Sequence, residues 1–337
     1  MVKKVNIGVI GAGRISYIHC RNLRFNIPEA NILMISDIKI QAAKKYADEF
    51  NISDITEDYR KIIENPGIDA VVICSSSDTH SFMIEEAAQA GKHIFCEKPI
   101  DLNLEKINRA LKAVEKSGVK LQVGFNRRFD PNFQKARKII QSGKIGELNI
   151  LKITSRDPKP QSFEYLKTCG GIFFDMTIHD FDMARFLSRS EVEEVYVIGG
   201  VLVHPFFKEC GDLDTAAITL KFKNGAIGVI DNCRRAVYGY DQRAEIFGSK
   251  GMINVGNKLI DTVELSDSKN TTKALLPYFF MERYGDSFIN EMKEFVQCII
   301  KDTSPSVTGI DGKMPVILAM ASKLSYENNR PVKVSEV

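Results

Sequence analysis

A predicted strand that runs straight into a glycine-rich turn lies at the start of the chain, and it limits the fold more than any other feature. Residues 4–10 are typical of a buried strand, and Gly11, Gly13 and Ser16 take the three glycine places of a G-x-G-x-x-G pattern. Gly11 permits a tight turn, Gly13 lets the backbone approach a pyrophosphate, and Ser16 is small enough for close packing of the next helix. The pattern predicts a dinucleotide-binding turn. The alternative is a simple tight turn between a strand and a helix.

The residues around this turn indicate which dinucleotide would bind. The helix that follows begins at Arg14 and Ile15, where free N–H groups are available to phosphates. Asp37 ends the second predicted strand, where a carboxylate accepts hydrogen bonds from adenosine ribose hydroxyls and repels a 2′-phosphate. We therefore expect NAD rather than NADP, a preference that Lys39 could weaken. Asp37 could also cap the helix that starts near Lys39, and the two roles are compatible.

The order of the predicted elements divides the chain into two parts. Strand and helix signals alternate over the first 125 residues, which predicts a parallel α/β sheet of the Rossmann type. Beyond them, several strand-like segments follow one another with hairpin signals such as Lys223-Asn224-Gly225. We therefore expect a nucleotide-binding domain over residues 1–125 and an α+β domain with an open, mainly antiparallel sheet over residues 126–337. The last helix and the last strand could pack back on the first domain.

Composition and charge exclude several classes of protein. The 337 residues carry 46 Lys and Arg against 43 Asp and Glu, and the net charge of +3 is too small for a nucleic-acid or membrane-surface protein. A transmembrane helix needs ~18 or more consecutive apolar residues, which the sequence lacks, and its start is too poor in apolar residues for a signal peptide. Seven scattered cysteines without a C-x-x-C pair favour free thiols in a reducing cytoplasm over disulfides or zinc.

Two polar clusters follow predicted strands of the first domain. Ser75, Ser76 and His80 come after the strand at 69–74. Side chains at the carboxyl ends of parallel strands line ligand clefts, so we expect these three to line the cofactor cleft.

The second cluster is Glu97-Lys98-Pro99, which follows the strand at 93–96. Pro99 restricts the backbone of Lys98, and a lysine fixed at a strand end can hold its ammonium against a substrate oxygen. We count Glu97 and Lys98 among the cofactor-binding residues as well. The alternative for Lys98 is a surface lysine in a turn.

One predicted helix, at 170–187, carries the strongest sign of catalysis. Asp175 and His179 are four residues apart and Asp182 lies three further along, so on a helix all three share one face. A histidine is suited to taking a proton near neutral pH, and a carboxylate one turn away can orient it and stabilise its charged form. The alternatives are a structural salt bridge and, less favoured because no second histidine lies nearby, a pair of metal ligands. We therefore expect no metal.

Several of these motifs together resemble one known family. The turn at 11–16, Glu97-Lys98-Pro99, the segment 124–130 (GFNRRFD) and Asp175-x-x-x-His179 are similar to the glucose–fructose oxidoreductase and inositol dehydrogenase superfamily. The runs at 155–158, 175–186 and 238–243 look most like its inositol 2-dehydrogenase branch, and the resemblance covers nearly the whole chain.

The resemblance implies residue roles that the spacing alone does not give. Lys98, Asp175 and His179 carry over as the catalytic trio, and Arg127, Asp157 and Tyr238 as groups that touch a polyol. The branch also implies NAD-dependent oxidation of myo-inositol at its 2-position, a cis bond before Pro99 and a homotetramer formed through the open sheet. Some inositol dehydrogenases have an amide where this chain has Asp157, which leaves the substrate stereochemistry open. The alternatives are a sister enzyme for scyllo-inositol or a sugar, with NAD or NADP, and a nucleotide-sensing regulator without catalysis.

The second sheet also predicts self-assembly. A sheet covered by helices on one face leaves the other exposed, and segments 195–203, 216–222 and 226–230 are rich in apolar residues. We expect a homo-oligomer, with a tetramer favoured, joined through that face.

Overall fold

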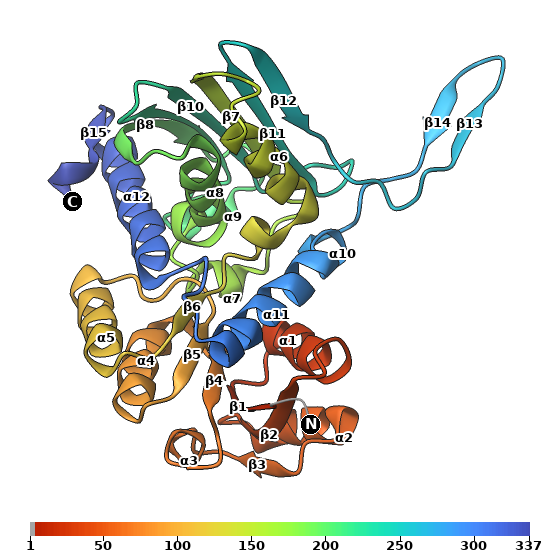
Figure 1. Ribbon diagram of the computed structural model, residues 1–337. Helices are drawn as coiled ribbons and strands as arrows, with labels where there is room; N and C mark the ends of the chain where they lie inside the picture. The colour runs from red at the N-terminus through yellow and green to blue at the C-terminus, as the bar shows by residue number, and fades with distance from the viewer. Residues whose placement is uncertain (1–3) are drawn as a thin grey trace. The chain divides into compact units, whose positions relative to one another are not determined.

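The computed structural model describes residues 4–337 and divides the chain into two compact units (Figure 1). Unit 1 comprises the residues up to Asp130 together with Asp286–Val316, and unit 2 comprises Pro131–Gly285 and Ile317–Val337. This division differs from the expected domains 1–125 and 126–337, because a segment near the end of the chain returns to the first unit.

Unit 1 is built on a six-stranded sheet whose strands are all parallel, which confirms the predicted Rossmann-type domain. The strand order reverses at β1, between β2 and β4, and ligands bind outside the carboxyl ends of strands at such a point. In spatial order the strands are β3 (Asp54–Thr56), β2 (Ala30–Ser36), β1 (Val5–Ile10), β4 (Ala70–Ile73), β5 (His93–Cys96) and β6 (Leu121–Val123). The helices are α1 (Arg14–Phe25), α2 (Ile40–Phe50), α3 (Arg60–Ile63), α4 (His80–Gln89), α5 (Leu104–Ser117) and most of α11 (Gly285–Lys301), with the first residues of α12 (Gly309–Asn328).

Helix α11 belongs to unit 1 because one of its faces completes the core of that unit. Met292, Phe295 and Val296 are fully buried in the same apolar cluster as Val9 and Phe95 of the sheet. The sequence predicts the helix correctly, but the unit that it joins depends on contacts with strands that lie about two hundred to three hundred residues earlier in the chain.

Unit 2 is built on a seven-stranded sheet that is mainly antiparallel, as predicted. One neighbouring pair, β7 and β10, is parallel and was not predicted. The last strand pairs with β8 of this sheet and belongs to unit 2, whereas the first residues of the last helix belong to unit 1. In spatial order the strands are β12 (Gly251–Val255), β11 (Asp241–Gly248), β7 (Leu148–Arg156), β10 (Ile227–Cys233), β9 (Thr215–Phe222), β8 (Val192–Gly200) and β15 (Val332–Lys333). The helices are α6 (Pro131–Gln141), α7 (Phe163–Leu166), α8 (Ile178–Ser188), α9 (Phe206–Glu209), α10 (Phe280–Arg283) and the rest of α12.

The two faces of this second sheet differ in exposure. Helices α6 and α8 lie over one face in Figure 1. Half of the apolar residues of the segments expected to form the exposed face, among them Val197, Ile218 and Ile230, are buried instead. The exposed face carries a row of large apolar side chains that are neighbours in register across four strands: Met252, Phe247, Ile150 and Ile227.

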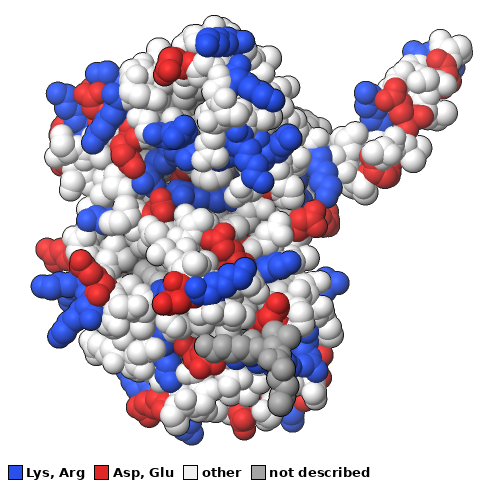
Figure 2. Space-filling model, viewed as in Figure 1, with Lys and Arg blue, Asp and Glu red and all other residues white. Residues whose placement is uncertain are grey.

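Two further features of unit 2 were not predicted. The helix expected at 170–187 is present, but its first part is a short π-helix over Phe173–Thr177 that continues into α8. Strands β13 (Glu264–Ser266) and β14 (Thr271–Lys273) form a hairpin that projects from unit 2 and carries both acidic and basic side chains (Figure 2).

The helices and the cysteines of the described residues bear on membrane insertion and on disulfide formation. Each helix within residues 4–337 is too short or too polar to cross a bilayer. All seven cysteines lie in this range, and each is a free thiol.

Candidate active site

The glycine turn of unit 1 has the geometry that a dinucleotide requires. Gly11 has φ +95°, and a Cβ there would lie 2.7 Å from the carbonyl oxygen of Cys74, so only glycine fits. A Cβ on Gly13 would instead meet open space within the described residues. Helix α1 begins immediately afterwards at Arg14 without a side-chain cap, so its first N–H groups are available to an anion. These observations fit a pyrophosphate at the turn, as the sequence predicts.

Asp37 links this turn to the end of β2. Its Oδ2 accepts a hydrogen bond from the Ala12 N–H at 2.7 Å, and its Oδ1 accepts one from the Lys39 N–H at 2.8 Å. Each carboxylate oxygen retains a lone pair, so the same side chain can accept the ribose hydroxyls. The next residue, Ile38, is 86% exposed and was missed by the sequence analysis. An exposed isoleucine beside the acid predicted to bind the ribose offers an apolar surface for a nucleotide base.

The three predicted residues after β4 differ in their exposure to solvent. Ser75 is half-buried and its hydroxyl lies 2.6 Å from the Thr79 hydroxyl, whereas Ser76 is exposed. His80 is 1% exposed, and its ring nitrogens lie 2.8 Å from the Pro99 carbonyl oxygen and 3.1 Å from the Ser75 carbonyl oxygen. Burial lowers the pKa of His80, which favours the neutral ring. The buried His80 ring thus lies between the Pro99 and Ser75 carbonyls, where a neutral ring donates to one of them, and its contact with the cofactor stays a prediction.

Lys98 follows β5 and is half-buried, and its peptide bond to Pro99 is cis, as the resemblance implies. Glu97, the residue before Lys98, is held by contacts with α1 and with the backbone of Lys98. Glu97 Oε1 lies 2.6 Å from Nε2 of the buried His19 of α1, and Glu97 Oε2 accepts a bond from the Lys98 N–H at 3.3 Å. Glu97 thus connects the helix after the glycine turn to the backbone of Lys98, and its contact with the cofactor stays a prediction. Arg127, predicted to touch the polyol, is buried in unit 1 on the 3-10 turn Asn126–Phe129.

In unit 2, Asp175 lies at the centre of a polar cluster that extends from the buried Arg234 and Asp157 to the exposed Tyr165. The Tyr165 hydroxyl donates to Asp175 Oδ1 at 2.7 Å, and Arg234 Nη1 donates to Asp175 Oδ2 at 2.8 Å. The same Arg234 nitrogen forms an ion pair with Asp157 Oδ2 at 3.6 Å. The structure therefore brings together two predicted residues, Asp157 and Asp175, through an arginine that the sequence analysis missed.

The parallel pair of strands explains why these residues meet. Asp157 directly follows β7 and Arg234 directly follows β10, and the two strands run side by side in the same direction. Their carboxyl ends therefore lie at the same edge of the sheet. The signal in the sequence was an arginine directly after a strand, but its use required knowledge of which strands are neighbours.

His179 lies in the first turn of α8, and this segment is anchored to the sheet from below. Thr177 Oγ1 donates to Asn232 Oδ1 at 2.6 Å, and Asn232 Nδ2 donates to Asp180 Oδ2 at 2.8 Å. His179 and Asp175 are half-buried, whereas Asp182 is completely buried. Asp182, three residues after His179 in the same helix, is therefore less accessible than the other two residues. The π-helical turn changes the angular spacing of Asp175 relative to the helix that follows.

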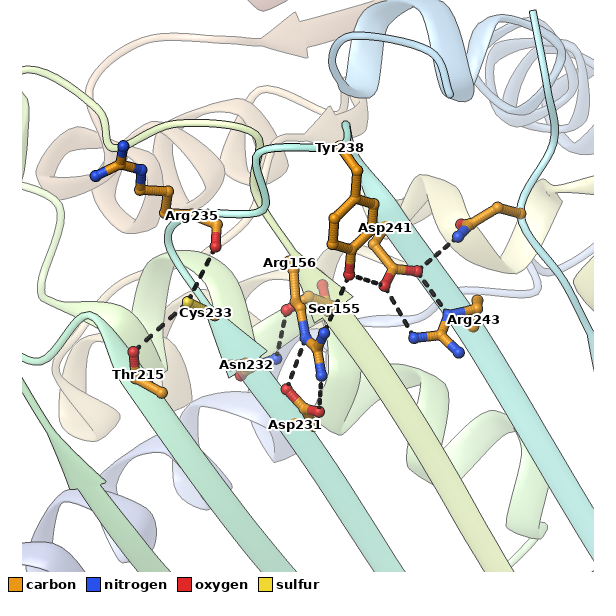
Figure 3. A network of polar contacts seen from close by, with 11 residues as sticks. Ser155, Arg156, Thr215, Asp231, Asn232, Cys233, Arg235, Tyr238, Asp241 and Arg243 are labelled. Carbon is orange, nitrogen blue, oxygen red and sulfur yellow. Dashed lines mark hydrogen bonds and ion pairs between the residues drawn. The ribbon is translucent and has the colours of Figure 1, made fainter. Parts of the chain in front are cut away.

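Tyr238 lies in a separate network, shown in Figure 3. Its hydroxyl accepts a bond from Arg156 Nη1 at 3.0 Å and donates to Asp241 Oδ2 at 2.7 Å. Arg156 is also paired with Asp231, and Arg243 donates twice to Asp241. Within unit 2, the Tyr238 hydroxyl is therefore not part of the cluster around Asp175, and its role toward a polyol stays a prediction.

Two family models match the chain. Residues 5–125 match the oxidoreductase family with an NAD-binding Rossmann fold, and residues 133–254 match the GFO/IDH/MocA C-terminal domain. The fold and the nucleotide-binding turn thus define an NAD-dependent oxidoreductase. More particularly, the chain belongs to the GFO/IDH/MocA family.

Individual relatives are similar over their whole length. The chain is 49% identical to an uncharacterized oxidoreductase of Bacillus subtilis, covering 99% of this chain and 98% of the relative. It is 47% identical to the myo-inositol 2-dehydrogenase of Thermotoga maritima, covering 99% of each. Among solved structures, scyllo-inositol dehydrogenase from Lactobacillus casei with bound NAD(H) and scyllo-inositol matches with a TM-score of 0.93 at 30% identity, covering 99% of this chain and 100% of that one.

Proposed function

We propose that this chain oxidises a secondary hydroxyl of a cyclic polyol with NAD, and that the polyol is myo-inositol, oxidised at its 2-position. The observation that carries the proposal is the Asp175 carboxylate, held between Tyr165 and Arg234 just before the helix that bears His179. The 47% identity to an enzyme named myo-inositol 2-dehydrogenase supports the choice of substrate.

Each residue of the catalytic trio has a distinct task in this reaction. The His179 imidazole accepts the proton of the substrate hydroxyl as a general base. Asp175 orients that imidazole and stabilises its cationic form. The Lys98 ammonium stabilises the substrate oxygen while the carbonyl forms, which is the kind of electrostatic contribution that is often largest in catalysis. Bound NAD supplies the acceptor for the hydride that leaves the same carbon.

The main alternative is a sister enzyme for scyllo-inositol or a sugar. Asp157 is the residue that favours this alternative. Some inositol dehydrogenases have an amide at this position, and a carboxylate and an amide present different hydrogen-bonding groups to a polyol. An ionised carboxylate accepts hydrogen bonds and donates none. Asp157 therefore favours a ring hydroxyl that donates its hydrogen bond.

A panel of inositol stereoisomers and aldoses, each assayed with NAD and with NADP, tests both proposals. We expect the highest kcat/KM for myo-inositol with NAD. A higher kcat/KM for scyllo-inositol or an aldose would replace the substrate. A protein that binds NADH but oxidises or reduces nothing in the panel would be the nucleotide-sensing regulator instead.

We also propose that the chain assembles into a homo-oligomer, with a tetramer favoured, through the exposed face of the second sheet. The apolar row on that face supports this, with exposures of 41% at Ile150, 52% at Ile227, 44% at Phe247 and 56% at Met252. Multi-angle light scattering at micromolar concentration tests the proposal, and a monomer would reject it.

A cytoplasmic location completes the proposal. The seven free thiols support it, because disulfides are rare in reducing compartments. Cell fractionation followed by immunoblotting tests the location, and recovery in an extracellular fraction would reject it.

A further inference from the structure

Arg234 is a buried cation whose role the proposed reaction leaves open. Its side chain is 1% exposed and is among the largest fully buried side chains of the chain. It directly follows β10, so a rigid sheet edge fixes its backbone. Burying a charge is costly unless it is well paired, and an apolar side chain of similar volume would often give a more stable protein. A buried arginine at such a site therefore calls for a function beyond stability.

The pairing of Arg234 is directed almost entirely at two carboxylates. Nη1 bonds Asp175 at 2.8 Å and pairs with Asp157 at 3.6 Å. Nε and Nη2 are buried without a hydrogen-bond partner within residues 4–337, so the guanidinium is not placed to satisfy all of its own donors. Arg234 instead places one positive charge beside two carboxylates. The proposed function assigns one of them, Asp175, to catalysis and the other, Asp157, to polyol binding.

The pKa shifts of Arg234 and Tyr165 keep both side chains in the forms that donate hydrogen bonds to Asp175. Burial alone would lower the pKa of Arg234, but the charges of Asp175 and Asp157 outweigh it and raise that pKa further. Burial and the charge of Asp175 raise the pKa of Tyr165, which therefore remains a donor. Arg234 thus stays charged, and the two Asp175 oxygens are held by two different donors.

Two other titratable groups surround the pair. Burial raises the pKa of Cys169 to about 11, so its thiol is neutral near pH 7. Burial also raises the pKa of Asp212, whose Oδ1 accepts a bond from the Ile172 N–H at 2.9 Å. Arg234 favours the ionised form of Asp175 by charge, through the contact of its Nη1 with Oδ2 at 2.8 Å.

We propose that Arg234 is a positioning residue that keeps Asp175 ionised and fixes it relative to Asp157. This inference rests on the proposed function, because the importance of an ionised Asp175 follows from its role beside His179. Arg234 acts through the two carboxylates and needs no contact with the polyol. Tyr165 holds the other oxygen of Asp175, so the carboxylate cannot rotate without losing one of the two bonds.

The test compares three variants of Arg234 with a matched control. Arg234→Met removes the charge, Arg234→Gln removes it but keeps an amide donor, and Arg234→Lys keeps the charge. Arg235 is the control, because it is the next residue, is exposed, and its guanidinium points away from the network in Figure 3. We measure kcat, KM, the pH profile of kcat/KM, the NADH dissociation constant and Tm for every variant.

We expect Arg234→Met and Arg234→Gln to lower kcat at least tenfold and to move the acid limb of the pH profile up by about one unit or more, because a lost cation raises the pKa of a neighbouring acid. Arg234→Lys should restore most of the profile, and Arg235→Met should leave kcat, KM and the profile unchanged. The NADH dissociation constant should be unchanged throughout. A lower Tm with an unchanged pH profile would overturn the proposal and leave Arg234 as a structural residue.

A measurement without turnover separates this inference from the proposed function. The carboxyl ¹³C resonance of Asp175 in aspartate-labelled protein, assigned by its loss in Asp175→Asn, reports the ionisation of that residue directly. We expect its titration midpoint to rise in Arg234→Gln and to stay near the wild-type value in Arg234→Lys. If the wild type oxidises no polyol but the midpoint shifts, the proposed function fails and the positioning role stands. An unshifted midpoint in a folded Arg234→Gln overturns the positioning role whatever the substrate.

Discussion

The two units contribute to the proposed reaction with different parts of the polypeptide. Unit 1 presents mainly backbone to the dinucleotide: a glycine at positive φ, an open position at Gly13 and the uncapped start of α1. Unit 2 presents charged side chains, with Arg234 held between Asp175 and Asp157. A backbone site depends on a few consecutive residues, whereas a side-chain cluster depends on which strands are neighbours. The comparison teaches that substitutions in the two units should affect different measured quantities.

His179→Ala should give the largest effect and confine it to catalysis. Removal of the proposed base should lower kcat by about 10²–10⁴-fold. The NADH dissociation constant should not change, because the proposed nucleotide-binding residues belong to unit 1. Steady-state kinetics and NADH fluorescence titration measure the two quantities.

The exposed His204, also in unit 2, provides the control for this experiment. His204→Ala should leave kcat unchanged. The double variant His179→Ala with Asp175→Asn should be little worse than His179→Ala alone, because residues that act as a unit are not additive. A near-wild-type kcat for His179→Ala would remove the proposed base.

Two glycine variants should separate stability from nucleotide affinity in unit 1. In Gly11→Ala the methyl group would meet the Cys74 carbonyl at a strained φ, so we expect a loss of stability of about 1–3 kcal/mol even without NADH. In Gly13→Ala the methyl group meets open space at φ −88°, so stability without NADH should stay within about 0.5 kcal/mol. Only the affinity for NADH should fall, by about tenfold or more, or ~1.4 kcal/mol.

Thermal unfolding with and without NADH measures both effects. If Gly13→Ala binds NADH as tightly as the wild type, the pyrophosphate does not approach this turn. In that case the contrast between a backbone site in unit 1 and a side-chain cluster in unit 2 is lost.

Asp37 is the one charged side chain on which we place nucleotide selectivity in unit 1. Asp37→Ser should shift the ratio of kcat/KM for NADP to that for NAD by about tenfold or more, which is roughly 1.4 kcal/mol. Asp37→Asn is a useful companion, because it removes the charge but keeps an oxygen for the Ala12 N–H. An unchanged cofactor ratio in both variants would mean that Asp37 does not face the ribose.

Glu291 should give the smallest effect on function and a clear effect on stability. Burial and the charge of Glu97 raise the pKa of this α11 carboxyl well above its usual range. The folded state therefore binds an extra proton above the ordinary pKa, and the associated stability is lost as pH rises toward the folded pKa. Glu291→Gln has no ionisable group at this position, so its free energy of unfolding should not show this decrease with pH. The difference in free energy of unfolding between the variant and the wild type should therefore increase with pH, by at most about 1.4 kcal/mol per pH unit.

Urea denaturation at pH 5, 6, 7 and 8 measures this difference. The exposed Glu115→Gln on α5 of the same unit should show no such trend and serves as the control. A stability difference that does not vary with pH would mean that Glu291 is ionised in the folded protein. Unit 1 would then contain a buried charge, as unit 2 does at Arg234.

The contrast between features set by consecutive residues and features set by neighbouring strands also explains how much could be predicted from the sequence. The parallel sheet, the glycine turn and Asp37 were predicted because each depends on residues close together in the chain. The π-helical turn at Phe173–Thr177 was missed because its sequence also has helical periodicity. Arg234 was missed because its partners are set by the parallel pairing of β7 and β10, which no local signal encodes.

His80 and Glu97 illustrate a second kind of limit. Glu97 directly follows β5 and His80 begins the helix after β4, which is the side of a parallel sheet where ligand-binding residues are expected. The structure shows that their side chains turn inward, toward Pro99 and His19 respectively. Position along the strand is predictable from sequence, but burial of an individual polar side chain depends on the neighbours that receive it.

The return of the chain to unit 1 after Gly285 bears on how the protein folds as it is synthesised. The core of unit 1 lacks Met292, Phe295 and Val296 until α11 has left the ribosome. Unit 2 is equally incomplete until β15 pairs with β8 at Val332. Neither unit can therefore close around a finished core while it is a nascent chain, and loss of the last fifty residues would damage both at once.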